Sequence, residues 1–147
     1  MAGRARKVAV EFLPETPGAR LPYRATDGSA CFDLAAAVPA VLVRGKVELV
    51  RTGLKVRCPR GTFLEVRPRS GLASRGVLMV NAPGTVDADY SGEVRVPFTY
   101  LFPGRYRIEV GDRIAQVRLV GEDRASFRRG RVAPVGSRTG GFGSTGR

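Results

Sequence analysis

Short apolar runs separated by glycine and proline are the feature that most constrains the fold of this chain. Its 147 residues include 19 glycines and 10 prolines, and no run over ten residues carries a helical period. The clearest alternation places five side chains on one face of a strand: Val94, Val96, Phe98, Tyr100 and Phe102. Strict alternation between such breaks is typical of strands, so we predict an all-β sandwich, barrel or jelly roll.

The length is that of one domain. Further strands are expected near residues 8–12, 47–49, 63–66, 106–110 and 114–120, and one short helix near 68–76, with Ser70 as its N-cap. Pro97 cannot donate a backbone hydrogen bond, so we expect its strand not to be paired on both sides along its full length. Residues 1–7 form a basic arm on a β domain that we place at 1–120. Residues 121–147 hold little apolar material and are expected to form a flexible arm.

The stretch 80–96, VNAPGTVDADYSGEVRV, carries the densest group of reactive side chains. It is expected to be strand, turn, strand, with Asp87, Asp89 and Tyr90 at the mouth of a hairpin. Carboxylates on a constrained loop can activate water or hold a hard cation, and a ring can stack on a sugar or base. The alternative is an ordinary turn whose carboxylates satisfy their own backbone.

The composition excludes several kinds of catalysis and gives the chain a high net positive charge. There is no histidine, which excludes Ser-His-Asp catalysis and His-ligated zinc. The net charge is +12, and all 25 basic residues except Lys7, Lys46 and Lys55 are arginine. A polyanionic partner is therefore plausible, although most arginines are expected to be solvated. Without a signal segment, a membrane-length apolar run or paired cysteines, we expect an intracellular protein, cytoplasmic or nuclear.

Three segments could hold phosphate. Arg69-Ser70-Gly71 precedes or opens the expected helix, where free N–H groups attract anions. Residues 140–146, GGFGSTG, combine backbone amides with hydroxyls, and residues 111–116, GDRIAQ, add a charged turn followed by an amide. The glycine-rich segment lacks the lysine and context of a P-loop.

Taken in order, SACFDLAA at 29–36, PRSGLA at 68–73, NAPGTVDADYSGEV at 81–94, GDRIAQ and GGFGSTG resemble the five motifs of the trimeric dUTPases. The resemblance implies a distorted jelly-roll β-barrel and a homotrimer whose active sites are shared between subunits. It implies Mg²⁺-assisted attack of water on the α-phosphate of dUTP, which yields dUMP and pyrophosphate. That reaction keeps uracil out of DNA and supplies dUMP for dTMP synthesis.

The same resemblance assigns roles to individual residues. Asp87 would activate the water, Tyr90 would exclude a 2′-hydroxyl, and Asp33 would place Mg²⁺ through water. The uracil edge would be read by Asn81 and the backbone around Thr85 and Val86. The phosphate chain would be held by Arg69, Ser70, Gly71 and Gln116. The substrate-binding set also includes Gly84, Arg95, Arg138 and, on an arm closing over a neighbouring subunit, Phe142, Gly143, Ser144 and Thr145.

Alternatives to this function come from other classes. A dCTP deaminase of the same fold would need a glutamate ten residues beyond Asp87, where this chain has Pro97. A binding or signalling protein derived from a dUTPase would be expected to have lost a site residue, and none is lost here. A nucleic-acid binder, which the net charge of +12 suggests, is not favoured, and no specific nucleic acid is expected as a partner. The basic residues are not interleaved with aromatic residues, and no motif that reads single strands or duplexes appears. The last motif departs from the family pattern by one position, with Ser137 where the arginine usually stands and Arg138 after it.

Overall fold

Eleven antiparallel strands and one turn of helix build the part of the chain that the computed structural model describes, residues 6–133 and 135–136. The elements are β1 (Ala9–Phe12), β2 (Phe32–Ala35), β3 (Ala40–Val43), β4 (Glu48–Arg51), β5 (Leu54–Arg57), β6 (Thr62–Arg67), α1 (Ser70–Ala73), β7 (Val77–Met79), β8 (Gly84–Val86), β9 (Arg95–Tyr100), β10 (Arg105–Ile108) and β11 (Arg113–Gly121). The expected all-β fold with one short helix is confirmed. None of the described helices is long and apolar enough to cross a bilayer.

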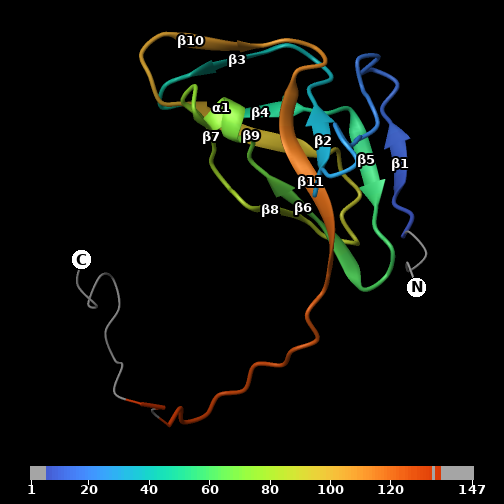
Figure 1. Cartoon of the computed structure of the whole chain (residues 1–147), viewed down its shortest axis with the longest axis vertical. Coiled ribbons are helices and arrows are strands. Elements are labelled where there is room, and N and C mark those ends of the chain that lie inside the picture. Colours follow the sequence, from blue (N-terminus) through green and yellow to red (C-terminus); the bar gives the residue numbers. More distant parts are fainter. Residues whose placement is uncertain (1–5, 134, 137–147) are drawn as a thin grey trace.

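The strands pair into two sheets and two ribbons (Figure 1). The order is β2-β11-β6-β8 in the larger sheet and β4-β9-β7 in the smaller one, while β1 pairs with β5 and β10 with β3. Apolar side chains from all four units meet in one buried cluster, including Leu34, Leu42, Leu54 and Phe98. The core therefore lies between the sheets, and alternate residues of strands such as β5 and β6 face away from it.

Strand β9 follows its predicted pattern along its paired length. Val96 and Phe98 are buried, whereas Phe102 lies beyond the end of β9 and is 52% exposed, contrary to expectation. The pairing with β4 covers Arg95–Phe98, and the pairing with β7 covers Phe98–Tyr100, so the two ladders overlap only at Phe98. The expectation drawn from Pro97 is therefore confirmed.

Two local expectations were wrong. The expected strand at 77–80 and the strand after Gly92 do pair, as β7 with β9, but they do not form a simple hairpin. The segment between them was expected to be loop and contains β8, which pairs with β6 in the other sheet. The chain crosses from one sheet to the other between β7 and β8, since β6 and β9 offer each of these three-residue strands a longer partner. Ser70 is the first residue of α1 and not its N-cap; Arg69 holds that place in an extended conformation, without a capping side-chain hydrogen bond.

Strand β11 ends at Gly121, and residues 122–133 hold no helix or strand. The boundary that we placed at residue 120 remains a prediction.

Replacement of Phe98 by alanine should cost about 3–5 kcal/mol of unfolding free energy, because it opens a cavity where both β9 ladders meet. Urea denaturation at one fixed protein concentration measures this. Val41→Ala, on the outward side of β3, should stay within about 0.5 kcal/mol of the parent. Equal losses in the two variants would contradict the assignment of Phe98 to the core.

Candidate active site

One pocket of about 610 Å³ gathers six of the residues that the sequence singled out. These are Asn81, Thr85, Val86, Asp87, Tyr90 and Arg95, and the wall is completed by Leu49, Gly92, Glu93, Val94 and Pro97. Gly84 lies behind it: a Cβ there would come within 3.2 Å of the Asn81 amide nitrogen. The pocket thus combines an amide, a carboxylate, a phenol and a guanidinium with an apolar patch.

The backbone of β8 and the following turn place Asp87 and Tyr90 at this pocket. β8 ends at Val86, which is buried, so the next side chain, Asp87, points outwards. The Tyr90 N–H donates to the Asp87 carbonyl at 3.1 Å. Since the backbone closes the turn, the Asp87 carboxylate is left exposed on the pocket wall.

Tyr90 is fixed at the hydroxyl end of its ring. Its hydroxyl donates to the Glu93 carbonyl at 3.0 Å. The ring lies over Gly92, where a Cβ would collide with the phenol. The ring, 47% exposed, therefore presents a flat surface beside Asp87.

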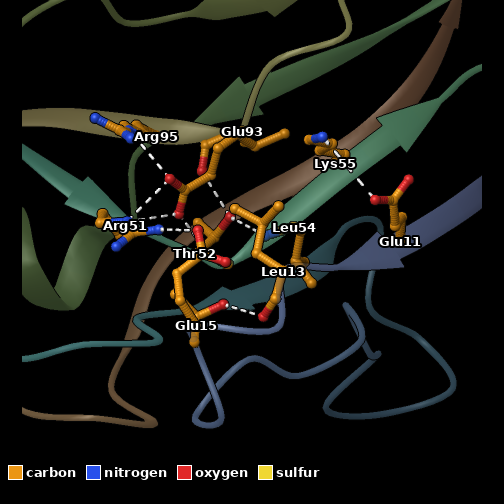
Figure 2. Close-up of polar contacts among 12 residues, drawn as sticks. Glu11, Leu13, Glu15, Arg51, Thr52, Leu54, Lys55, Glu93 and Arg95 are labelled. Carbon is orange, nitrogen blue, oxygen red and sulfur yellow. Dashed lines mark hydrogen bonds and ion pairs between the residues drawn. The ribbon is translucent and has the colours of Figure 1, made fainter.

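Glu93 is the charged pocket residue that reasoning from the sequence missed. Its carboxylate, with a side-chain exposure of 4%, accepts from Arg51 Nε and Arg95 Nε at 2.9 Å each and from the Gly53 N–H at 2.9 Å (Figure 2). Burial by itself would raise the pKa of Glu93, but the bonds from Gly53, Arg51 and Arg95 outweigh it and lower the pKa. The only signal in the sequence is an acid two residues before an arginine on the same strand face.

A second cluster brings together the residues expected at the phosphates. Asp33, a buried residue of β2, accepts a hydrogen bond from Arg113 Nη1 at 3.1 Å and forms an ion pair with Arg69 Nε at 3.1 Å. Arg69 also donates to the Arg113 carbonyl at 2.9 Å, and Gln116 donates to the Pro68 carbonyl at 3.0 Å. Arg113 belongs to the GDRIAQ segment but was not among the predicted residues. Ser70 and Gly71 lie exposed on α1 beside this cluster.

The two clusters line different pockets. Arg69, Gly71, Arg75 and Arg113 line a pocket of about 330 Å³ that shares no residue with the one around Asp87. Within one chain, the groups suited to a base and sugar are thus separate from those suited to phosphates.

The described residues are suited to contact a divalent cation only through water. They contain no group of three or more His, Cys, Asp or Glu side chains placed to hold a metal ion. Each Asp33 oxygen already lies 3.1 Å from a guanidinium nitrogen, which leaves room for a water-mediated contact. This suits a cation that is carried mainly by phosphate oxygens.

The predicted residues Arg138, Phe142, Gly143, Ser144 and Thr145 lie outside the described residues.

Comparison with known proteins adds independent evidence. The family model described as dUTPase matches residues 18–146. A deoxyuridine 5'-triphosphate nucleotidohydrolase of Rickettsia bellii is 41% identical over 131 residues, covering 86% of this chain and 87% of that protein.

Solved structures agree on the fold. The dUTPase of Staphylococcus bacteriophage 80alpha, solved with dUpNHpp, aligns with a TM-score of 0.80 at 24% identity and covers 97% of this chain and 99% of its own. A mutant dUTPase from phage phi11 of S. aureus, described as coordinating a structural Mg(II) ion, gives 0.75 at 21% identity, with coverage of 84% and 95%. The dUTPase-type jelly roll is thereby confirmed.

The charge of Glu93 should stabilise the fold in a pH-dependent way. A lowered pKa means that this contribution is fully present above the unfolded value of about 4.3 and is lost as the pH falls through the folded value. Glu93→Gln should therefore cost about 1–3 kcal/mol near pH 7, and the difference from the parent should shrink below about pH 4.3. Urea unfolding across this range measures it. A difference that stays constant with pH would show that the charge contributes nothing.

Proposed function

The chain belongs to the dUTPase family and hydrolyses dUTP to dUMP and pyrophosphate, and we propose that the pocket around Asp87 is where this reaction takes place. The observation that carries the proposal is that Asn81, Asp87 and Tyr90 meet around one hollow. The reaction removes dUTP before it can enter DNA and provides dUMP for dTMP synthesis.

Asp87 acts as the general base. Its exposed carboxylate accepts a proton from a water molecule whose oxygen attacks the α-phosphorus. The bond between that phosphorus and the oxygen bridging to the β-phosphate breaks, and pyrophosphate leaves. Because the turn is closed by its backbone, the carboxylate can change its protonation state without opening the loop.

Tyr90 and Asn81 select the substrate. The Tyr90 ring packs against the deoxyribose and leaves no room for a 2′-hydroxyl, and its own hydroxyl is already committed to the Glu93 carbonyl. The Asn81 amide offers a donor and an acceptor to the uracil edge, together with the backbone of Thr85 and Val86. A base that leaves these groups unpaired is rejected, because buried unpaired polar groups are costly.

The triphosphate lies against the cluster around Asp33. Arg69 and Arg113 together carry one more charge than Asp33 neutralises, so this surface attracts phosphate. Mg²⁺ would be held by the phosphate oxygens, with Asp33 as a contact through water. When bound, it neutralises charge that develops on the phosphates.

A homotrimer completes the site. The base-and-sugar pocket and the phosphate cluster are separate within one chain, which supports their joining across a subunit boundary. The outward residues Leu49, Leu78 and Val80 on the β4–β9–β7 sheet are 51%, 45% and 45% exposed, an apolar face that a neighbouring subunit can cover. Residues 121–147 would close over a neighbour's nucleotide.

An intracellular location is supported by the free thiols of Cys31 and Cys58.

Asp87→Asn should lower kcat for dUTP by about 10²–10⁴, because an amide cannot accept the proton from water. Release of pyrophosphate measures it. Asp89→Asn is the matched control: this carboxylate lies two residues away, is exposed and is not among the pocket-lining residues, so its loss should leave kcat nearly unchanged. Undiminished turnover by Asp87→Asn, or an equal loss in both variants, would contradict the role of Asp87.

Shared sites make a complementation experiment possible. Asp87→Asn and Arg69→Ala chains should each be nearly inactive alone but should regain activity when co-expressed and purified as mixed trimers. Some sites would then combine an intact Asp87 from one chain with an intact Arg69 from another. Mixed oligomers of confirmed composition that stay inactive would show that each site is built within a single chain.

A further inference from the structure

The free end of the β3–β10 ribbon gathers basic residues that are far apart in the sequence. β3 runs into the turn Arg44-Gly45-Lys46, and β10 begins at Arg105, which pairs with Val43. The turn that joins β9 to β10 lies at this same end, next to α1 (Figure 1). We call the group formed by Arg44, Lys46, Arg75, Phe102 and Arg105 the basic end.

Backbone contacts hold these segments together. Arg44 forms a bridge with Tyr100, the last residue of β9. The Leu101 N–H donates to the Gly76 carbonyl at 2.9 Å, which places Arg75 beside the same turn. The Phe102 ring lies against Gly76, where φ is +80° and a Cβ would collide with the ring.

Phe102 is fixed and still half-exposed. Its ring meets Tyr100 edge to face at 5.8 Å, and Tyr100 in turn packs against Tyr106 at 5.7 Å. Its exposure of 52% leaves one part of the ring open to solvent. A held aromatic ring at the surface is suited to stacking against another flat group.

The surrounding charges are available to a partner. All four basic side chains are exposed, and none has an ion-pair partner among the residues that the structure describes. Arg107 extends this charge along the outer face of the ribbon, where it pairs with exposed Val41. Glu48, two residues after Lys46, offsets only a small part of it.

We propose that the basic end binds single-stranded nucleic acid without sequence preference, as a function additional to dUTP hydrolysis. Of its residues, Arg75 also lines the pocket at the Asp33 cluster. The arginines contact successive phosphates, and an unstacked base lies on Phe102. A duplex keeps its bases stacked and cannot use the ring. Electrostatic attraction of dUTP towards the active site would need the charges but not an exposed phenyl group.

Fluorescence anisotropy of a labelled oligothymidylate of about 15 nucleotides tests this with the full chain, between about 50 and 200 mM salt. Binding should weaken as salt rises. The double variant Arg105→Gln/Arg107→Gln should reduce the slope of log K against log salt by about 1.4, since each phosphate contact on a single strand contributes about 0.7.

Variants at the ring separate stacking from charge. Phe102→Leu keeps an apolar contact with Gly76 and should bind roughly ten-fold more weakly with an unchanged salt slope. Phe102→Tyr should bind as the parent does. As a matched control, Arg57→Gln/Arg60→Gln removes two exposed arginines elsewhere and should leave the slope unchanged. All variants should hydrolyse dUTP at the parent rate, which shows that they are folded.

Four outcomes would overturn the proposal. These are no binding at the lowest salt, duplex binding as tight as single-strand binding, parent-like binding by Phe102→Leu, and an equal loss in the control pair. If Arg105→Gln/Arg107→Gln instead lowers kcat/KM for dUTP in a salt-dependent way while oligonucleotide binding is unaffected, the basic end serves to attract substrate.

Discussion

A buried carboxylate, that of Glu93, is the constraint on which the walls of the pocket around Asp87 depend. A charge withdrawn from water is tolerated only when donors surround it, and here the donors come from β4, from the β4–β5 connection and from β9. The same segment supplies the carbonyl that fixes the Tyr90 hydroxyl. One residue thereby fixes the relative positions of strands that are distant in sequence, and the pocket takes its shape from them.

The carboxylates of Glu93, Asp33 and Asp87 suit different roles because their surroundings differ. Glu93 is buried and has several donors, which suits a structural role. Asp33 is buried between Arg69 and Arg113 and fixes the positions of both guanidinium groups. Asp87 is exposed in a turn that its backbone already closes, and this freedom is what a proton acceptor requires. Residue type alone does not distinguish the three.

The fold also gathers basic residues that are spread along the sequence. Along the sequence the arginines look like an even bias, and no cluster of basic and aromatic residues is apparent. The ribbon β3–β10 and the end of β9 bring basic residues from three separate segments around Phe102. Such a surface depends on strand pairing and on a glycine at position 76 that lets the ring approach.

The sequence by itself determined the all-β class, the buried face at Val96 and Phe98, and, through its five motifs, the family and most residues of the Asp87 pocket. These follow from local patterns, because alternation reports which face of a strand is buried and a motif keeps its residues adjacent. Only the tertiary structure decided that β7 and β8 belong to different sheets and that Phe102 is exposed. It also decided that Glu93 belongs to the pocket around Asp87 and Arg113 to the cluster around Asp33. The physical reason is that strand pairing and the partners of a buried charge depend on contacts between distant segments, which no local pattern specifies.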